Sequence, residues 1–286
     1  IYQDRKGFLW FGTYEGLSRF DGYGLVNYDR RDGLPHVFIN HITEDRQGRL
    51  WVATNGGGVA RLVEHSRENG GAKFVSFNIR EPNDPLVKRT NYVNRMVFDA
   101  RGNLWCLTDS GLYRAAVEDS QLQFEAIIEM ITNDSFVALE DADGRLWFGI
   151  GNELVEFRGS EIIHHGSIDG ASNSTLITGI ARDRGGRLLV ADASRVSEFV
   201  PPSPGKPRGE WRQQLALPSK QIGSIRTLLV DDAGALWLGA DIGLLKYADG
   251  KLSRYTAANG VPAGSVRTLA TDRAGNLWFG TGGGVC

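Results

Sequence analysis

The chain has 286 residues, of which 41% are hydrophobic and 23% are charged, and its formal net charge at pH 7 is -2. This size and composition predict a soluble globular protein with a large core. The balanced charge excludes the basic surface that nucleic acids or anionic membranes require, and no apolar run of about eighteen residues predicts a membrane span. We therefore expect no nucleic-acid partner and no membrane contact by this fragment.

A ten-residue motif begins at Asp4 and recurs along the whole chain. Each copy has an Asp, a Gly three residues later, a Leu five residues later and, except in the fifth copy, a Trp six residues later. Successive copies are about 41 to 54 residues apart, a period typical of propeller blades and solenoids. The repeat residues are Asp4, Gly7 and Trp10; Asp45, Gly48 and Trp51; Asp99, Gly102 and Trp105; Asp141, Gly144 and Trp147; Asp183 and Gly186; Asp231, Gly234 and Trp237; and Asp272, Gly275 and Trp278.

Each position of the motif has a physical reason. An Asp at the first and a Gly at the fourth position of a four-residue turn are typical of a type I turn, which here joins two antiparallel strands. The apolar run after the turn, such as Leu9-Trp10-Phe11, predicts a strand that is buried on both faces. We therefore assign the repeat tryptophans to packing between blades rather than to ligand binding.

Two further strands are predicted after each motif. A Gly-apolar step such as Gly16-Leu17 opens a third strand, which ends at a turn such as Asp21-Gly22. A fourth, partly alternating strand follows, as expected for an outer position in a sheet. We predict fourth strands at 25–28, 74–77, 124–127, 162–165 and 252–255. No stretch has helical periodicity, so the repeating unit is predicted to be a four-stranded meander.

Seven such units predict an all-β fold, a β-propeller of four-stranded antiparallel blades in which radial closure protects most strand edges. A linear solenoid is disfavoured because neither end of the chain resembles a polar capping repeat. The chain starts in the tail of a first strand and stops inside a third, so the blade at the chain ends is predicted to be incomplete. We expect residues 1–286 to form a single β-propeller domain excised from a larger protein.

The sequence contains no catalytic or cofactor motif. Phosphate-cradling glycine loops and the Gly-x-Ser-x-Gly elbow are absent, so we expect no cofactor and no enzymatic activity in this fragment. His164 and His165 are adjacent on a predicted strand and point to opposite faces, so they cannot hold one metal ion together. We expect no metal site, and we interpret Cys106 as a small core residue.

Candidate binding residues follow from the geometry of a propeller, whose central channel opens at the start of each first strand. Counting five residues back from the later motif aspartates gives Asn40, Asn94, Phe136, Thr178, Arg226 and Arg267. A polar group buried there without a partner would cost about 1–3 kcal/mol, so these groups are expected to face water or a ligand. Arg226, Arg267 and the neighbouring Arg95 are suited to a carboxylate or sulfate, or else they line a water-filled channel.

Trp211 is the remaining candidate binding residue. It lies outside the repeat, just after the proline-rich insert 201–207, which is predicted to project as an extended loop. The indole ring is suited to stacking on a sugar ring, or else it anchors the loop.

The motif Asp-x-x-Gly-x-Leu-Trp-Phe-Gly-Thr, the following Gly-Leu-x-Arg-Phe-Asp and the Gly-Leu-Pro before the next copy resemble the two-component regulator propeller repeat. Residues 4–13 and 16–21 match that repeat at almost every position, whereas residues 183–192 lack both the Trp and the Thr. The resemblance covers essentially the whole chain. The repeat builds the extracytoplasmic sensor region of bacterial hybrid histidine kinases and of some diguanylate cyclases.

The resemblance implies a periplasmic ligand-sensing module of an inner-membrane receptor, which in several family members responds to oligosaccharide fragments. It also implies a small-molecule or oligosaccharide ligand and a homodimer of the full-length receptor. Two alternatives remain at the level of the sequence. One is a scaffold for protein–protein interaction, and the other is a propeller enzyme similar to streptogramin lyase.

Overall fold

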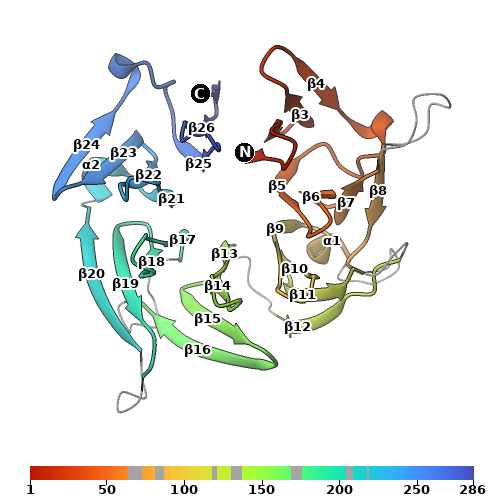
Figure 1. Cartoon of the computed structure of the whole chain (residues 1–286), viewed down its shortest axis with the longest axis horizontal. Coiled ribbons are helices and arrows are strands. Elements are labelled where there is room, and N and C mark those ends of the chain that lie inside the picture. The colour runs from red at the N-terminus through yellow and green to blue at the C-terminus, as the bar shows by residue number, and fades with distance from the viewer. Residues whose placement is uncertain are drawn as a thin grey trace. The chain divides into compact units, whose positions relative to one another are not determined.

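The computed structural model describes residues 1–63, 73–80, 87–117, 121–129, 137–168, 176–203, 209–217 and 219–286. The chain divides into two compact units, Ile1–Asn133 and Asp134–Cys286. Both units consist of antiparallel sheets whose strands follow one another in the sequence (Figure 1). The fold is all-β, and the prediction of a β-propeller built from four-stranded blades is confirmed. That residues 1–286 form a single domain stays a prediction.

The first unit holds three four-stranded blades. The first blade consists of β1 (Tyr2–Gln3), β2 (Leu9–Gly12), β3 (Leu17–Phe20) and β4 (Leu25–Tyr28). The second blade consists of β5 (Ile39–Glu44), β6 (Leu50–Thr54), β7 (Val59–Leu62) and β8 (Phe74–Phe77). The third blade consists of β9 (Val93–Phe98), β10 (Asn103–Thr108), β11 (Gly111–Ala116) and β12 (Glu125–Glu129).

The second unit holds four blades, of which the last has three strands. The fourth blade consists of β13 (Val137–Glu140), β14 (Leu146–Ile150), β15 (Glu153–Arg158) and β16 (Glu161–Ser167). The fifth consists of β17 (Gly179–Arg182), β18 (Leu188–Ala191), β19 (Arg195–Val200) and β20 (Glu210–Ala216). The sixth consists of β21 (Ile225–Val230), β22 (Leu236–Ala240), β23 (Gly243–Ala248) and β24 (Lys251–Tyr255). The last consists of β25 (Val266–Thr271), β26 (Leu277–Thr281) and β27 (Gly284–Val285).

Helical structure is confined to single turns in the described part of the chain. These are α1 (Val87–Thr90), α2 (Ser219–Ile222) and two 3-10 turns, η1 (Arg30–Asp32) and η2 (Ala257–Asn259). No helix among the described residues has the length and apolar character needed to cross a membrane.

The predicted fourth strands agree closely with the structure. Strands β4 and β8 have the predicted bounds, and β12, β16 and β24 differ from prediction by one or two residues at their ends. Strand β20 was not predicted, because the proline-rich insert 201–207 separates it from the third strand of its blade. Residues 204–207 of that insert, like Phe136, lie outside the described residues.

The Asp-x-x-Gly turn has the same hydrogen bonds in all seven copies. The Gly N–H donates to the Asp carbonyl oxygen, and the Gly φ lies between 72° and 95°, which a residue with a side chain rarely adopts. In the six copies that have a Trp, the indole Nε1 donates to the Asp Oδ2 at 2.7–3.0 Å. The motif therefore stabilises both the turn and the position of the buried indole ring.

Trp147 and Trp51 pack both within their own blade and against the next one. Trp147 is 0% exposed, stacks on His165 of its own fourth strand with ring centroids 5.5 Å apart, and meets Phe199 of the fifth blade edge-on at 5.8 Å. Trp51 makes the same pair of contacts with Phe77 and Phe98. Aromatic contacts therefore join the second blade to the third and the fourth to the fifth. Cys106 lies buried in the same core as Trp51, and burial raises the pKa of its thiol.

Candidate functional site

Four of the predicted binding residues occupy one structural position, a β-bulge at the start of a first strand. In the second blade Ile39 pairs with Thr54 and His41 with Ala53, so that Asn40 is an extra residue without a partner across the ladder. The registers of the third, sixth and last blades shift in the same way. The extra residues there are Asn94, Arg226 and Arg267.

The bulge separates a buried residue from a polar one. The residue directly before each bulge residue is a buried aliphatic side chain, namely Ile39, Val93, Ile225 or Val266. A bulge re-aims one side chain out of the ordinary alternation of a strand, and bulges are frequent beside functional sites. In each of these blades the residue before the bulge therefore packs in the core, and the polar bulge residue after it lies at the end of the strand.

In the first unit the bulge side chains bind neighbouring polar groups. The Asn40 amide donates to the carbonyl oxygen of Val93 in the next blade at 2.9 Å. The Asn94 amide donates to Asp109, which follows the second strand of its own blade, at 2.7 Å. The Asn40 amide donates further to Asn55 and Asn94, and the Asn94 amide donates to the Tyr92 carbonyl oxygen, so each side chain keeps acceptor capacity at its oxygen rather than free N–H donors.

Arg95 follows the bulge of the third blade and has an unusual environment. Its side chain is half-buried, and it forms no hydrogen bond or ion pair with the part of the chain that the structure describes. Burial lowers the pKa of Arg95, and burial together with the charge of Arg95 holds the pKa of His41 on β5 well below its ordinary value. The site therefore combines a positive charge with a neutral imidazole and is suited to an anion.

In the second unit the arginine at the bulge already has a carboxylate partner. Arg226 Nε lies 2.7 Å from Asp241 Oδ1, and its Nη2 lies 3.1 Å from Oδ2. Asp241 also accepts hydrogen bonds from the Ser224 N–H and the Ser265 hydroxyl. This two-bond pairing raises the pKa of Arg226 and lowers that of Asp241. A ligand that binds Arg226 has to share it with Asp241.

Three further predicted binding residues are Arg267, Thr178 and Trp211. Arg267 is exposed on the bulge of β25, and Thr178 directly precedes β17 and donates its N–H to the Ala191 carbonyl oxygen at 2.8 Å. Trp211 lies on β20 opposite Phe199, with ring centroids 4.8 Å apart, so one side of its indole ring is used in packing. Ligand contact by these three residues stays a prediction.

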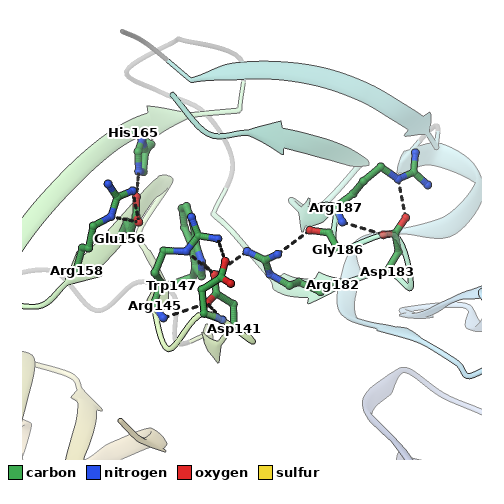
Figure 2. Close-up of polar contacts among 11 residues, drawn as sticks. Asp141, Arg145, Trp147, Glu156, Arg158, His165, Arg182, Asp183, Gly186 and Arg187 are labelled. Carbon is green, nitrogen blue, oxygen red and sulfur yellow. Dashed lines mark hydrogen bonds and ion pairs between the residues drawn. The ribbon is translucent and has the colours of Figure 1, made fainter. Parts of the chain in front are cut away.

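The adjacent histidines of β16 bind different glutamates. His164 Nδ1 lies 3.0 Å from Glu153, whereas His165 Nε2 lies 3.0 Å from Glu156. Glu156 is 0% exposed and also accepts two hydrogen bonds from Arg158 (Figure 2). The described residues contain no group of three His, Cys, Asp or Glu side chains placed to hold a metal ion.

Asp141 is the centre of a second polar network, which joins the fourth and fifth blades (Figure 2). Its buried carboxylate accepts from the Trp147 indole, from Arg145 at 2.8 Å and from Arg182 of the next blade at 2.6 Å. Burial alone would raise the pKa of Asp141, but these hydrogen bonds and charges lower it on balance. The sequence analysis did not predict the bond between Asp and Trp, although their joint occurrence at a spacing of six was a usable signal.

Three segments of the chain match a known family. Residues 1–15, 33–56 and 260–283 match the model of the two component regulator propeller. No curated protein is a match to this chain.

Solved structures with the same fold include two from B. thetaiotaomicron, each the extracellular domain of a hybrid two component system. They have TM-scores of 0.73 and sequence identities of 20% and 19%, and they cover 100% and 99% of this chain. The chain spans 39% of the length of each. Virginiamycin B lyase from Staphylococcus aureus, at 14% identity, has a TM-score of 0.71, with 98% of this chain and 90% of the lyase covered. At these identities the likeness concerns the fold alone.

Proposed function

Because the chain carries two component regulator propeller repeats, we propose that it is the ligand-sensing module of a bacterial hybrid two-component receptor. The module lies outside the cytoplasm, in the periplasm, and binds a small molecule or an oligosaccharide without turning it over. A histidine kinase elsewhere in the receptor supplies the output, and the receptor acts as a homodimer. The extracellular domains of hybrid two component systems that share this fold support the proposal.

One observation in the first unit supports a ligand at the bulge end of the blades. Arg95 has no acidic partner among the described residues, although it is half-buried and lies beside the neutral His41. A guanidinium removed from water without a partner costs free energy, which an incoming carboxylate or sulfate recovers. The amide side chains of Asn40 and Asn94, on the bulges of β5 and β9, supply hydrogen bonds for sugar hydroxyls.

The ligand that fits this chemistry is an acidic oligosaccharide. The test is the midpoint of thermal unfolding of residues 1–286, measured with neutral and with acidic oligosaccharides. A ligand at a hundred times its dissociation constant stabilises the folded chain by about 2.7 kcal/mol. We expect this stabilisation from an acidic oligosaccharide such as an oligogalacturonide, and not from a neutral oligogalactoside of the same length.

Variants locate the binding site. Arg95→Gln is expected to remove the stabilisation, while Arg226→Ala and Arg267→Ala test the same position in the second unit. Each variant is compared with its own midpoint without ligand, so that a loss of stability is not mistaken for a loss of binding. If no oligosaccharide raises the midpoint, or if Arg95→Gln keeps the full effect, ligand binding at this position is wrong.

A further inference from the structure

A cavity lies in the first unit at the opposite end of the first strands, where the Asp-x-x-Gly turns are. Its volume is about 440 Å³, which is within the range of about 300–1,000 Å³ typical of small-molecule sites. Side chains of the first blade, among them Phe8 and Arg19, form one wall, and side chains of the second blade, among them Glu44 and Arg61, form the other. The bulge of β5 is at Asn40 and Glu44 ends that strand, so this cavity and the bulge site are distinct.

Arg19 is the unusual residue of this cavity. Its guanidinium lies over the rings of Phe8 and Trp10, 4.6 and 5.8 Å from their centroids. Its Nε is buried and has no hydrogen-bond partner, and the guanidinium forms no ion pair within the described residues. Buried polar groups are nearly always hydrogen-bonded, so a group left in this state calls for a partner from outside the chain.

The third blade shows how the same position can be completed within the chain. Arg114 lies opposite Trp105 as Arg19 lies opposite Trp10, and it covers the indole ring in the same way, at 5.4 Å from the centroid. Across the sheet Arg114 faces Glu125 and forms an ion pair with it at 2.7 Å.

Arg19 and Arg61 instead face aliphatic side chains across the sheet. Arg19 pairs with Val26 and Arg61 pairs with Val75, neither of which supplies an acceptor side chain. Both arginines line the cavity, one from each blade. The carboxylate that Glu125 gives to Arg114 is thus absent from the cross-strand position of Arg19, where Val26 lies.

The acidic groups of the cavity are already engaged by donors of their own. Asp4 accepts from the Phe8 N–H at 2.9 Å and from the Trp10 indole at 2.7 Å. Glu44 accepts from the Arg5 N–H at 2.9 Å and from the Tyr2 hydroxyl at 3.3 Å. These bonds occupy the carboxylates, whereas the guanidinium of Arg19 keeps all its donors for a ligand.

We propose that this cavity binds a small organic oxyanion, carrying a carboxylate, sulfate or phosphate group, between Arg19 and Arg61. The planar guanidinium donates two parallel hydrogen bonds to such a group, and the exposed part of Phe8 contacts the apolar part of the ligand. Beside Arg19, the oxyanion takes the role that Glu125 has beside Arg114 in the third blade. This second site goes beyond the proposed bulge-end site and does not depend on it.

The test is isothermal titration of residues 1–286 with four probes: sodium sulfate, sodium phosphate, galacturonate and neutral galactose, at constant ionic strength. At least one oxyanion is expected to bind, galactose is not, and the probe that binds most tightly identifies the anionic group. Arg19→Gln is expected to weaken this binding at least tenfold, and Arg19→Lys, which keeps the charge but loses the planar fork, less. The matched control is Arg114→Gln, because Glu125 already satisfies that arginine, and its affinity should equal that of the unchanged chain.

The possible results separate the two sites. If no oxyanion binds the unchanged chain, or if Arg19→Gln and Arg114→Gln bind alike, the proposal is wrong. Arg95→Gln leaves binding at the cavity intact and removes only the effect of the oligosaccharide. The midpoint of urea unfolding, measured for each variant without ligand, identifies a variant that has lost its fold. If Arg19→Gln does not fold, the affinity of Arg19→Lys is compared with that of the unchanged chain instead.

Discussion

The junction between the first and second blades and the junction between the fourth and fifth are built from the same repeat but differ at one position. The residue directly before the repeat Asp is Glu44 in the second blade and Arg182 in the fifth. Arg182 donates to Asp141 of the preceding blade and to the Gly186 carbonyl oxygen of its own turn (Figure 2). One side chain thus connects two successive Asp-x-x-Gly turns.

Glu44 makes a different connection: it accepts from the Tyr2 hydroxyl and the Arg5 N–H of the preceding blade, and its carboxylate lies 4.0 Å from Arg5 Nε. The repeat Asp of the preceding blade, Asp4, carries the same charge as Glu44. Burial is the main cause that raises the pKa of Glu44, and the charge of Asp4 raises it further. A cavity of about 440 Å³ lies beside these two carboxylates. The charge at this position therefore decides whether the residue binds the repeat Asp of the preceding blade, as Arg182 does at what we call the closed junction, or leaves a cavity beside that Asp.

The largest effect is expected for the indole ring at the closed junction. Trp147→Ala removes a fully buried ring that contacts His165 and Phe199, and we expect a loss of about 3–5 kcal/mol in the free energy of unfolding. Urea denaturation followed by circular dichroism measures it. Trp211→Ala, at a half-buried tryptophan, should cost less. An unchanged midpoint for Trp147→Ala would contradict the packing role of the repeat tryptophans.

At the closed junction, removing the charge of the repeat Asp is expected to lower the stability more than the same substitution in another blade. Asp141→Asn leaves Arg145 and Arg182 facing a neutral group in a buried position, and we expect a loss of about 3 kcal/mol. Asp231→Asn is the matched variant, since Asp231 binds the Trp237 indole and backbone N–H groups. Its expected loss is about 1 kcal/mol. Equal losses in the two variants would show that the arginines contribute nothing at this junction.

Exchanging the two junction residues tests the comparison directly. Arg182→Glu removes the charged hydrogen bond to Asp141 and places two carboxylates together, with an expected loss of about 2 kcal/mol. Glu44→Arg places a guanidinium near Asp4 but removes the bonds that Glu44 accepts from Arg5 and Tyr2, so we expect a net change in stability below about 1 kcal/mol. It should also weaken oxyanion binding, because the side chain enters the cavity. Chemical denaturation and titration measure the two effects. A loss in Glu44→Arg as large as that in Arg182→Glu would refute the equivalence of the two positions.

The smallest effect is expected from pH. Burial lowers the pKa of His165, although Glu156 opposes this shift, and burial also lowers the pKa of His36 and His41. A histidine with a depressed pKa contributes stability that is complete above about pH 6.5 and is lost as the pH falls toward the folded-state pKa. The thermal midpoint should therefore decrease from pH 7.5 to pH 5.5.

One variant isolates the contribution of His165. Replacing it with Phe gives the fourth blade the aromatic side chain that Phe77 supplies in the second, and the decrease of the midpoint should become smaller. His164→Gln is the control, because that imidazole is mostly exposed. A pH dependence that is the same in His165→Phe and in the unchanged chain would exclude His165 as a source of it.

Much of the blade was predictable because its signals are local. The Asp-x-x-Gly turn, the apolar strand after it and the Gly-apolar step are completed by residues within about fifteen positions of each other. The bulge also has a local signal that the sequence analysis did not use. A buried aliphatic residue directly before a polar one, as in Ile39-Asn40 and Val266-Arg267, breaks the alternation of a strand.

The candidate site was only partly predictable. Counting back from the motif located the residues at the bulges, and Arg95 was included as their neighbour. The pairing of Arg226 on β21 with Asp241, which directly follows β22, brings together residues fifteen positions apart, so it depends on the register of β21 with β22. The half-burial of Trp211 depends in the same way on its pairing with Phe199.

The amino-acid pattern alone was sufficient for the repeat, the turns, the strand order and the β-propeller class, because each is set by hydrogen bonds and burial within one blade. Only the tertiary structure determined which charged side chains remain available for a ligand. Arg19 and Arg114 have the same place in their repeats and the same indole beneath them. Their difference comes from the residue across the sheet, Val26 or Glu125, because electrostatic partners are chosen by distance in space.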